Sequence, residues 1–177
     1  MIIGIVGPAY SGKSTVVATA IQRYLEFQHV ILPFAKPLKD MATYFGWDGK
    51  KDEKGRNFLQ ILGTEVGRCY NKDFWVDQWV SSVEKYEGTC GVISDDTRFD
   101  NEVKAIKDLG GIIIRVMSND EARTERAAQK GEKLPPPHKS EQWDQLPFDY
   151  EVFNNTQGSL EDAIKDITEQ ISLFLKQ

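Results

Sequence analysis

Short apolar runs alternate with longer segments of helical apolar spacing along most of this chain. Apolar runs without regular polar alternation are typical of strands that are buried on both faces of a parallel sheet. Such runs lie at residues 2–6, 29–34, 91–94, 112–116 and 150–153. The pattern therefore predicts five strands, and the third run leads directly into two acidic residues.

The segments between these runs predict helices that pack one face against the sheet. They cover residues 15–27, 38–45, 58–69, 74–83, 101–109 and 120–130, followed by a closing helix that Ser159 caps and that runs to Leu175. Residues 46–55 are polar, so we expect a loop there. The alternation predicts a three-layer α/β domain with a mostly parallel central sheet, whose ligands bind along the carboxyl edge.

Residues 7–14, between the first strand and the first helix, read GPAYSGKS. Two glycines five positions apart, followed by lysine and a hydroxyl, form the phosphate-binding loop pattern. The glycines let backbone N–H groups curl around phosphate oxygens, and the next helix presents its positive end to them. Lys13 then reaches the β- and γ-phosphates, and Ser14 offers its hydroxyl to Mg²⁺. This predicts a P-loop NTPase fold with a nucleoside triphosphate held by the loop. The residues concerned are Gly7, Tyr10, Ser11, Gly12, Lys13, Ser14 and Thr15.

Length and charge narrow the class of protein. A chain of 177 residues is most simply one domain. With 22 basic and 27 acidic residues its formal net charge is −5, which argues against a protein that neutralises a nucleic-acid backbone or an anionic membrane. Cys69 and Cys90 have no companions at metal-ligand spacing, so we expect buried thiols and no zinc site. The partners we expect are small molecules.

The first six residues bear on localisation. They are apolar, but they run directly into the phosphate loop, lack a basic leader and are too short to span a bilayer. We therefore expect a cytoplasmic protein, in the host cytoplasm if its source is viral.

A phosphate loop serves kinases, molecular switches, motors and helicases alike. The chain is too small for most motors. A guanine-nucleotide switch would carry Asn-Lys-x-Asp late in the chain, whereas Asn71-Lys72-Asp73 has its acid one position early and lies too soon. Kinases fit these observations best.

Acids and arginines near the carboxyl edge are the candidate catalytic groups. Asp95 and Asp96 follow the third strand, where an acid commonly organises the magnesium shell or orients the acceptor, and either could serve the metal. Arginine forks clamp phosphates and offset charge on a transferring group. The basic candidates are Arg68, Arg98, Arg123 and Arg126, with Lys36 and Lys39 as auxiliary charges. Residues 120–141, a charged helix and a Gly/Pro-rich segment, are expected to form a small lid.

The chain resembles the deoxynucleoside monophosphate kinases of the bacteriophage type, within the nucleoside monophosphate kinase group. The matching segments are GPAYSGKS at 7–14, FAKPLK at 34–39, LQILGTEVGR at 59–68, SDDTRFDNE at 94–102, HKSE at 138–141, and the late Asn154 before Gly158. The most specific parts are LQ-x-x-GTE at residues 59–65 and D-x-x-RF-x-NE at residues 95–102. Because the segments span most of the chain in the family's order, the resemblance is global.

The resemblance implies that ATP with Mg²⁺ occupies the loop and passes its γ-phosphoryl group to a deoxynucleoside monophosphate. The catalytic residues would be Lys13, Arg123, Arg126 and Asp95, with Ser14 and Asp95 at the metal. Asn154, with Asn155 as an alternative, would lie near the adenine. Substrate contacts would come from Lys36, Glu65, Arg68, Trp75, Arg98, His138, Ser140 and Glu141. Dimers are common in that group, so a homodimer is compatible with it.

Two rival functions stay open. A kinase of another small phosphorylated acceptor, above all one similar to animal-type phosphomevalonate kinase, shares the Ser-Asp-x-Arg strand end and a Ser-Glu segment. The run at 63–68 favours a nucleotide acceptor instead. A nucleotide-binding module without catalysis would lack lid arginines, and Arg123 and Arg126 are present.

Overall fold

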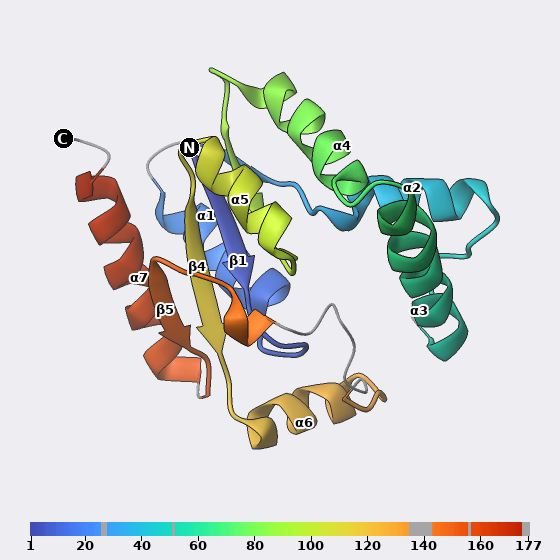
Figure 1. The fold of residues 1–177 in the computed structure, drawn as a ribbon. Helices are drawn as coiled ribbons and strands as arrows, with labels where there is room; N and C mark the ends of the chain where they lie inside the picture. Colours follow the sequence, from blue (N-terminus) through green and yellow to red (C-terminus); the bar gives the residue numbers. More distant parts are fainter. Residues whose placement is uncertain (26–27, 51, 135–142, 156, 175–177) are drawn as a thin grey trace.

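The computed structural model describes residues 1–25, 28–50, 52–134, 143–155 and 157–174. At its centre lies a five-stranded sheet in the order β2-β3-β1-β4-β5 (Figure 1). All four strand pairs are parallel. The strands are β1 (Ile2–Val6), β2 (His29–Ile31), β3 (Gly91–Ser94), β4 (Ile112–Met117) and β5 (Tyr150–Phe153).

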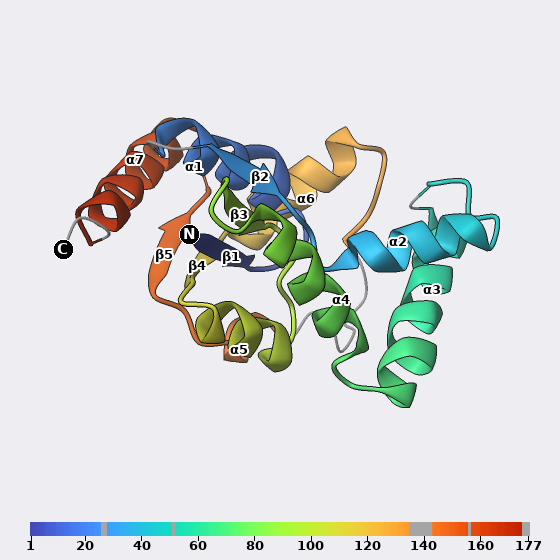
Figure 2. The ribbon, with the colours of Figure 1, turned by 90° about the horizontal axis from the view of Figure 1, so that it is seen from above.

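Helices cover both faces of this sheet (Figures 1 and 2). One face packs against a helix of wide π-type turns, η1 (Lys13–Ala18), against α1 (Thr19–Tyr24) and against α7 (Gln157–Phe174), with Ile21, Ile164 and Ile171 buried in between. The other face packs against α4 (Phe74–Val83) and α5 (Asp100–Asp108), where Trp79 and Ile106 are fully buried. The three-layer α/β architecture is therefore confirmed.

Three helical segments stand to one side of the sheet, beyond the carboxyl ends of β2 and β3 (Figure 2). They are α2 (Ala35–Tyr44), α3 (Glu53–Gln60) and η2 (Ile61–Arg68), which we call the helical wall. Beyond the carboxyl ends of β1 and β4 lies α6 (Asp120–Gln129). Two short 3₁₀ helices are also present, η3 (Glu84–Tyr86) and η5 (Trp143–Gln145).

Most strands and helices match the predicted ranges to within a few residues, and the exceptions have local causes. β2 stops at Ile31 rather than at residue 34, since Pro33 has no N–H to donate to a neighbouring strand. The loop expected at 46–55 is wrong at its end because Asp52 caps α3 by accepting from Gly55 N at 2.8 Å. α7 begins at Gln157, so Ser159 lies within the helix and is not its cap. None of the helices in the described ranges combines the length and apolar character that crossing a bilayer requires.

Candidate active site

The loop between β1 and η1 has the backbone that its glycines predict. Gly7 has a φ of 144°, and a Cβ at this position would lie 2.3 Å from the carbonyl oxygen of Val116. Gly12 has a φ of 92°, another conformation that L side chains rarely adopt. Tyr10, with a φ of 61°, is the one described non-glycine residue with positive φ. Its left-handed backbone places the tyrosine at the tip of the loop.

The Lys13 ammonium closes this loop from the inside. Lys13 is buried, and its Nζ donates to the carbonyl oxygens of Gly7 at 2.7 Å and Pro8 at 2.6 Å. Lys13 and Ser14 both line a cavity beside the loop, and Ser14 is exposed. A positive charge and a hydroxyl thus lie at the start of η1, as the sequence predicts.

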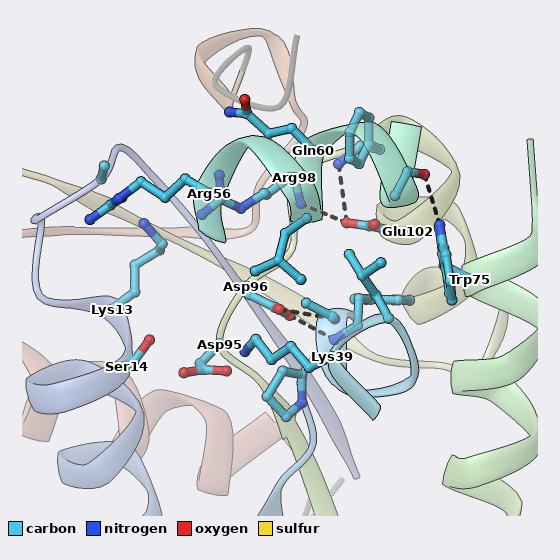
Figure 3. Close-up of a pocket in the computed structure, with 18 of the residues that line it drawn as sticks. Lys13, Ser14, Lys39, Arg56, Gln60, Trp75, Asp95, Asp96, Arg98 and Glu102 are labelled. Atoms are coloured by element: carbon cyan, nitrogen blue, oxygen red, sulfur yellow. Dashed lines mark hydrogen bonds between the residues drawn. The ribbon is translucent and has the colours of Figure 1, made fainter. Parts of the chain in front are cut away.

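The two adjacent acids after β3 have different surroundings. Asp96 accepts from Phe34 N at 2.7 Å and Ala35 N at 3.0 Å, and so anchors the start of α2. Burial, together with the nearby charge of Asp95, raises the pKa of Asp96. Asp95 is buried and lines the cavity, and its Oδ1 has no hydrogen-bond partner among the residues that the structure describes. In Figure 3 the Asp95 carboxylate lies next to the Ser14 hydroxyl.

The cavity, of about 590 Å³, lies between the phosphate loop, the end of β3 and the helical wall. Its lining carries more basic than acidic side chains. Figure 3 labels several of each. The basic ones are Lys13, Lys39, Arg56, Arg68, Arg98 and Lys130. The acidic ones are Asp95, Asp96, Glu102 and Glu132. A cavity of this charge favours an anionic ligand.

Arg68 is held by several neighbours. Its guanidinium forms an ion pair with Glu102, donates to Asn101 Oδ1 at 3.3 Å, and lies 3.8 Å from the centre of the Phe99 ring. Glu102 also accepts from Arg98 N at 2.7 Å. Burial raises the pKa of Glu102 to about 7, although the Arg68 charge opposes this. Through Glu102, Arg68 is tied to the backbone that carries Arg98.

The two arginines of α6 contact the phosphate loop from outside the cavity. Arg123 Nε donates to Ala9 O at 2.9 Å, and Arg126 donates to Tyr10 O at 3.2 Å. Arg126 also donates to Asn154 O at 2.7 Å, and burial lowers its pKa. Asn154 in turn donates from Nδ2 to Ser11 O at 2.7 Å. These three side chains brace the loop backbone and do not line the cavity.

The other predicted substrate residues fall into three groups. Trp75 lines the cavity and donates from its indole to Gly63 O at 2.8 Å. Lys36 and Glu65 do not line it: Lys36 pairs with Asp40 at 2.7 Å on the exposed side of α2, and Glu65 is exposed on η2. His138, Ser140 and Glu141 lie outside the described residues, as does the side chain of Thr15.

Sequence reasoning missed several residues of the helical wall that line the cavity. Arg56, Gln60 and Thr64 follow one another at intervals of four along α3 and η2. This spacing places side chains on one face of a helix. The signal was available, but the predicted loop at 46–55 and a helix starting at residue 58 left Arg56 outside any element. Lys39 occupies the position at the cavity that was expected of Lys36.

Comparisons with solved structures agree with this architecture. Shikimate kinase from Bacteroides thetaiotaomicron superposes with a TM-score of 0.52 at 14% identity, covering 97% of this chain and 98% of that chain. The TT1252 protein from Thermus thermophilus gives 0.57 at 17%, covering 98% and 97%. Shikimate kinase from Acinetobacter baumannii, in complex with shikimate, gives 0.51 at 12%, covering 98% and 92%. The chain has the three-layer α/β P-loop NTPase fold, which it shares with these structures. Its sequence matches no protein-family model and no curated protein.

Proposed function

We propose that the protein is a deoxynucleoside monophosphate kinase, which transfers the γ-phosphoryl group of ATP to a deoxynucleoside monophosphate and yields ADP and the diphosphate. The observation that carries the proposal is the shared cavity, which Lys13 and Ser14 of the phosphate loop line together with the basic side chains of Arg56 and Arg98. Two phosphorylated ligands repel each other, and positive side chains around the transfer path offset that repulsion and the charge on the transferring group.

At the donor end, the loop N–H groups and Lys13 would bind the ATP phosphates. The Ser14 hydroxyl and the unpartnered Oδ1 of Asp95 are oxygen donors of the kind that Mg²⁺ prefers, so these two residues would hold it. When bound, the ion supplies positive charge that offsets the charge on the β- and γ-phosphates. Arg123, Arg126 and Asn154 would keep the loop in the shape that this binding needs, with Asn154 nearest the adenine.

At the acceptor end, Arg98 would bind the monophosphate, and Lys39 would add charge in the role expected of Lys36. Arg68 would act on Arg98 through Glu102 instead of touching the phosphate. Gln60, Thr64 and Trp75 line the part of the cavity against the helical wall, where we propose that the sugar and base lie. An amide and a hydroxyl can both donate and accept, as recognition of a base edge requires.

The reaction needs little covalent help from the protein. The acceptor oxygen is already anionic near neutral pH, so its attack requires no general base. Lys13 and Arg98 would align the two phosphates and stabilise the charge on the transferring group. Residues 120–141 are proposed as a lid that limits hydrolysis of ATP by excluding water.

A kinase of a small hydroxy acid is the second candidate. One of the similar structures contains shikimate, and an acceptor hydroxyl would need a base to remove its proton. The unpartnered Oδ1 of Asp95 is the observation that favours this candidate, because it could accept that proton.

A coupled assay of ADP release tests the proposal. ATP with Mg²⁺ is offered together with each of the deoxynucleoside and ribonucleoside monophosphates, with mevalonate 5-phosphate, or with shikimate. Turnover of a deoxynucleoside monophosphate well above ATP hydrolysis alone is the expected result. Turnover of shikimate or mevalonate 5-phosphate alone would reject the deoxynucleoside monophosphate as the acceptor. ATP binding without ADP release on any acceptor would indicate a nucleotide-binding module without catalysis.

A further inference from the structure

Three side chains from distant parts of the sequence meet at one side of the cavity. Tyr10 lies at the tip of the phosphate loop, Arg56 on α3, and Glu132 three residues after α6 ends. The Tyr10 hydroxyl donates to Glu132 Oε2 at 2.5 Å. Arg56 donates to the Tyr10 hydroxyl oxygen at 3.0 Å and forms an ion pair with the same Glu132 oxygen. We call this group the Tyr10–Arg56–Glu132 cluster.

The cluster belongs to the cavity and is not part of a buried core. All three residues line the cavity together with Lys13. The Arg56 and Glu132 side chains are 35% and 36% exposed, so solvent and ligands reach them. In Figure 3 the Arg56 side chain, which comes from the helical wall, reaches toward Lys13. An ion pair of this exposure contributes little to stability, and its geometry calls for another reason.

Two of the other three carboxylates of the cavity differ from Glu132 in their hydrogen-bond partners. Asp96 accepts from the N–H groups that begin α2, and Glu102 accepts from the backbone N–H of Arg98 and pairs with Arg68. Both are tied to backbone within the sheet side of the cavity. Glu132 accepts from side chains alone in the contacts described for it, and both donors come from the helical wall and the tip of the phosphate loop.

We propose that Arg56 is a phosphate ligand of this site and that Glu132 and Tyr10 hold it aside until a phosphorylated ligand enters. A guanidinium binds phosphate through two parallel hydrogen bonds, and a phosphate of the ligand carries more charge than one carboxylate. Phosphates in the loop would also bring negative charge close to Glu132, and their repulsion of Glu132 would weaken its ion pair with Arg56. The identity of the ligand rests on the proposed function. The sequence analysis does not predict Arg56 as a site residue.

The two members of the ion pair therefore have opposite effects on binding. Removing the charge of Arg56 removes a ligand contact, so affinity falls. Removing the charge of Glu132 releases Arg56 and raises the fraction of the protein that is ready to bind, so affinity rises. If the cluster only tied α3 to the phosphate loop, both changes would loosen the cavity and lower affinity alike.

The test is equilibrium binding measured by calorimetry on the full chain, with ATP–Mg²⁺, ADP–Mg²⁺ and each of the four common deoxynucleoside monophosphates. Arg56→Gln is expected to weaken binding roughly tenfold or more, as for a lost charge-assisted contact. Glu132→Gln is expected to tighten it about threefold, and this gain should vanish in the Arg56→Gln background. Glu121→Gln, which removes an exposed acid on α6 outside the cavity, controls for the change in net charge.

The ligand series identifies which phosphate Arg56 contacts. Weaker binding of ATP but not of ADP assigns Arg56 to the terminal phosphate of the donor, whereas weaker binding of the monophosphates assigns it to the acceptor. Equal loss of affinity in both single variants, or no change in either, overturns the proposal. Thermal unfolding accompanies each variant, and Tyr10→Phe, which removes only a hydroxyl from the cluster, is expected to tighten binding in the same direction as Glu132→Gln.

Failure of this inference is distinct from failure of the proposed function. Opposite shifts in ATP affinity without turnover of any monophosphate would keep Arg56 as a phosphate ligand and reject the kinase assignment. Turnover of a monophosphate with shifts of the same sign in both variants would do the reverse. A wild-type chain that binds none of these nucleotides would contradict both.

Discussion

The two sides of the cavity are built in different ways. On the phosphate-loop side, charged and polar side chains hold the backbone in place. Lys13, Arg126 and Asn154 all donate to carbonyl oxygens of the loop. On the helical wall, α3 and η2 present side chains such as Arg56 and Gln60 to the cavity itself. The first side consists of main-chain atoms held by these side chains, and the second consists of side chains, which we propose that a ligand rearranges. Substitutions should therefore act on rate and shape on the loop side, and on ligand choice at the wall.

The largest effect is expected from Lys13→Ala. Under the proposed function, loss of a charge that would lie beside the β- and γ-phosphates should lower the rate of phosphoryl transfer by about two to three orders of magnitude. The fold should persist, because the two carbonyl oxygens to which Lys13 donates belong to one loop. The coupled ADP-release assay measures the first effect and thermal unfolding the second. A variant that unfolds without cooperativity would show that the loop side also supports the core.

Arg68→Ala is the next largest, and it separates a structural arginine from a ligand-binding one. Above the Glu102 pKa of about 7, the buried Glu102 carboxylate would be left without its ionic partner, which costs about 3 kcal/mol of unfolding free energy. Arg98→Ala, by contrast, should keep stability and raise the KM for the acceptor roughly tenfold, with a smaller change in the KM for ATP. Urea unfolding and steady-state kinetics on both variants measure the difference. Equal effects of the two variants on stability would remove this distinction.

A pH dependence is expected from Glu102, whose carboxyl has a pKa of about 7 in the fold and 4.5 in the unfolded chain. Between these values the folded protein keeps a proton that the unfolded chain has lost. The stabilisation from this group is therefore complete below pH 4.5 and is lost as the pH rises through about 7. Compared with Glu102→Gln, the wild type should lose up to about 3 kcal/mol of unfolding free energy over that window.

Urea unfolding of both proteins at pH 5, 6, 7 and 8 measures this loss. The difference between them should fall with pH and level off above 8. A difference that stays constant or grows with pH would place the Glu102 pKa near its ordinary value.

The smallest effect concerns two lysines on α2. Lys36 pairs with Asp40 in solvent, so Lys36→Ala should change stability by less than about 0.5 kcal/mol and leave the kinetics unaltered. Lys39 lines the cavity, so Lys39→Ala should raise the KM for the acceptor about threefold through lost charge. Steady-state kinetics on the two variants compares them directly. A stronger kinetic defect in Lys36→Ala would return that residue to the site.

The difference between the two sides also explains what the sequence could predict. Gly7, Gly12 and Lys13 lie within eight residues, and their spacing reflects a local backbone requirement, so the loop was predictable. Continuous apolar runs likewise predicted the strands, because a parallel sheet buries both faces. Asp95 and Asp96 were placed at the right edge, but their different partners depend on where α2 begins, which is a long-range packing fact.

The helical wall was less predictable for physical reasons. The start of α3 depends on a cap at Asp52 within a stretch rich in Gly and Lys, and the polar composition concealed it. The sequence suggests that Arg68 binds a phosphate. It does not reveal the ion pair of Arg68 with Glu102, because the two residues lie 34 positions apart in the chain. Arg123 and Arg126 were correctly grouped on one helix face, yet that face meets the outside of the loop.

Asp95 and Asp96 share a peptide bond while serving opposite sides of the cavity. Asp96 carries the first turn of α2, and Asp95 lies beside Ser14. Under the proposed function, a shift of α2 on acceptor binding would move the backbone of Asp95, whose carboxylate would lie at the donor end of the cavity. The proposed acceptor and donor sites would then be coupled through two adjacent residues.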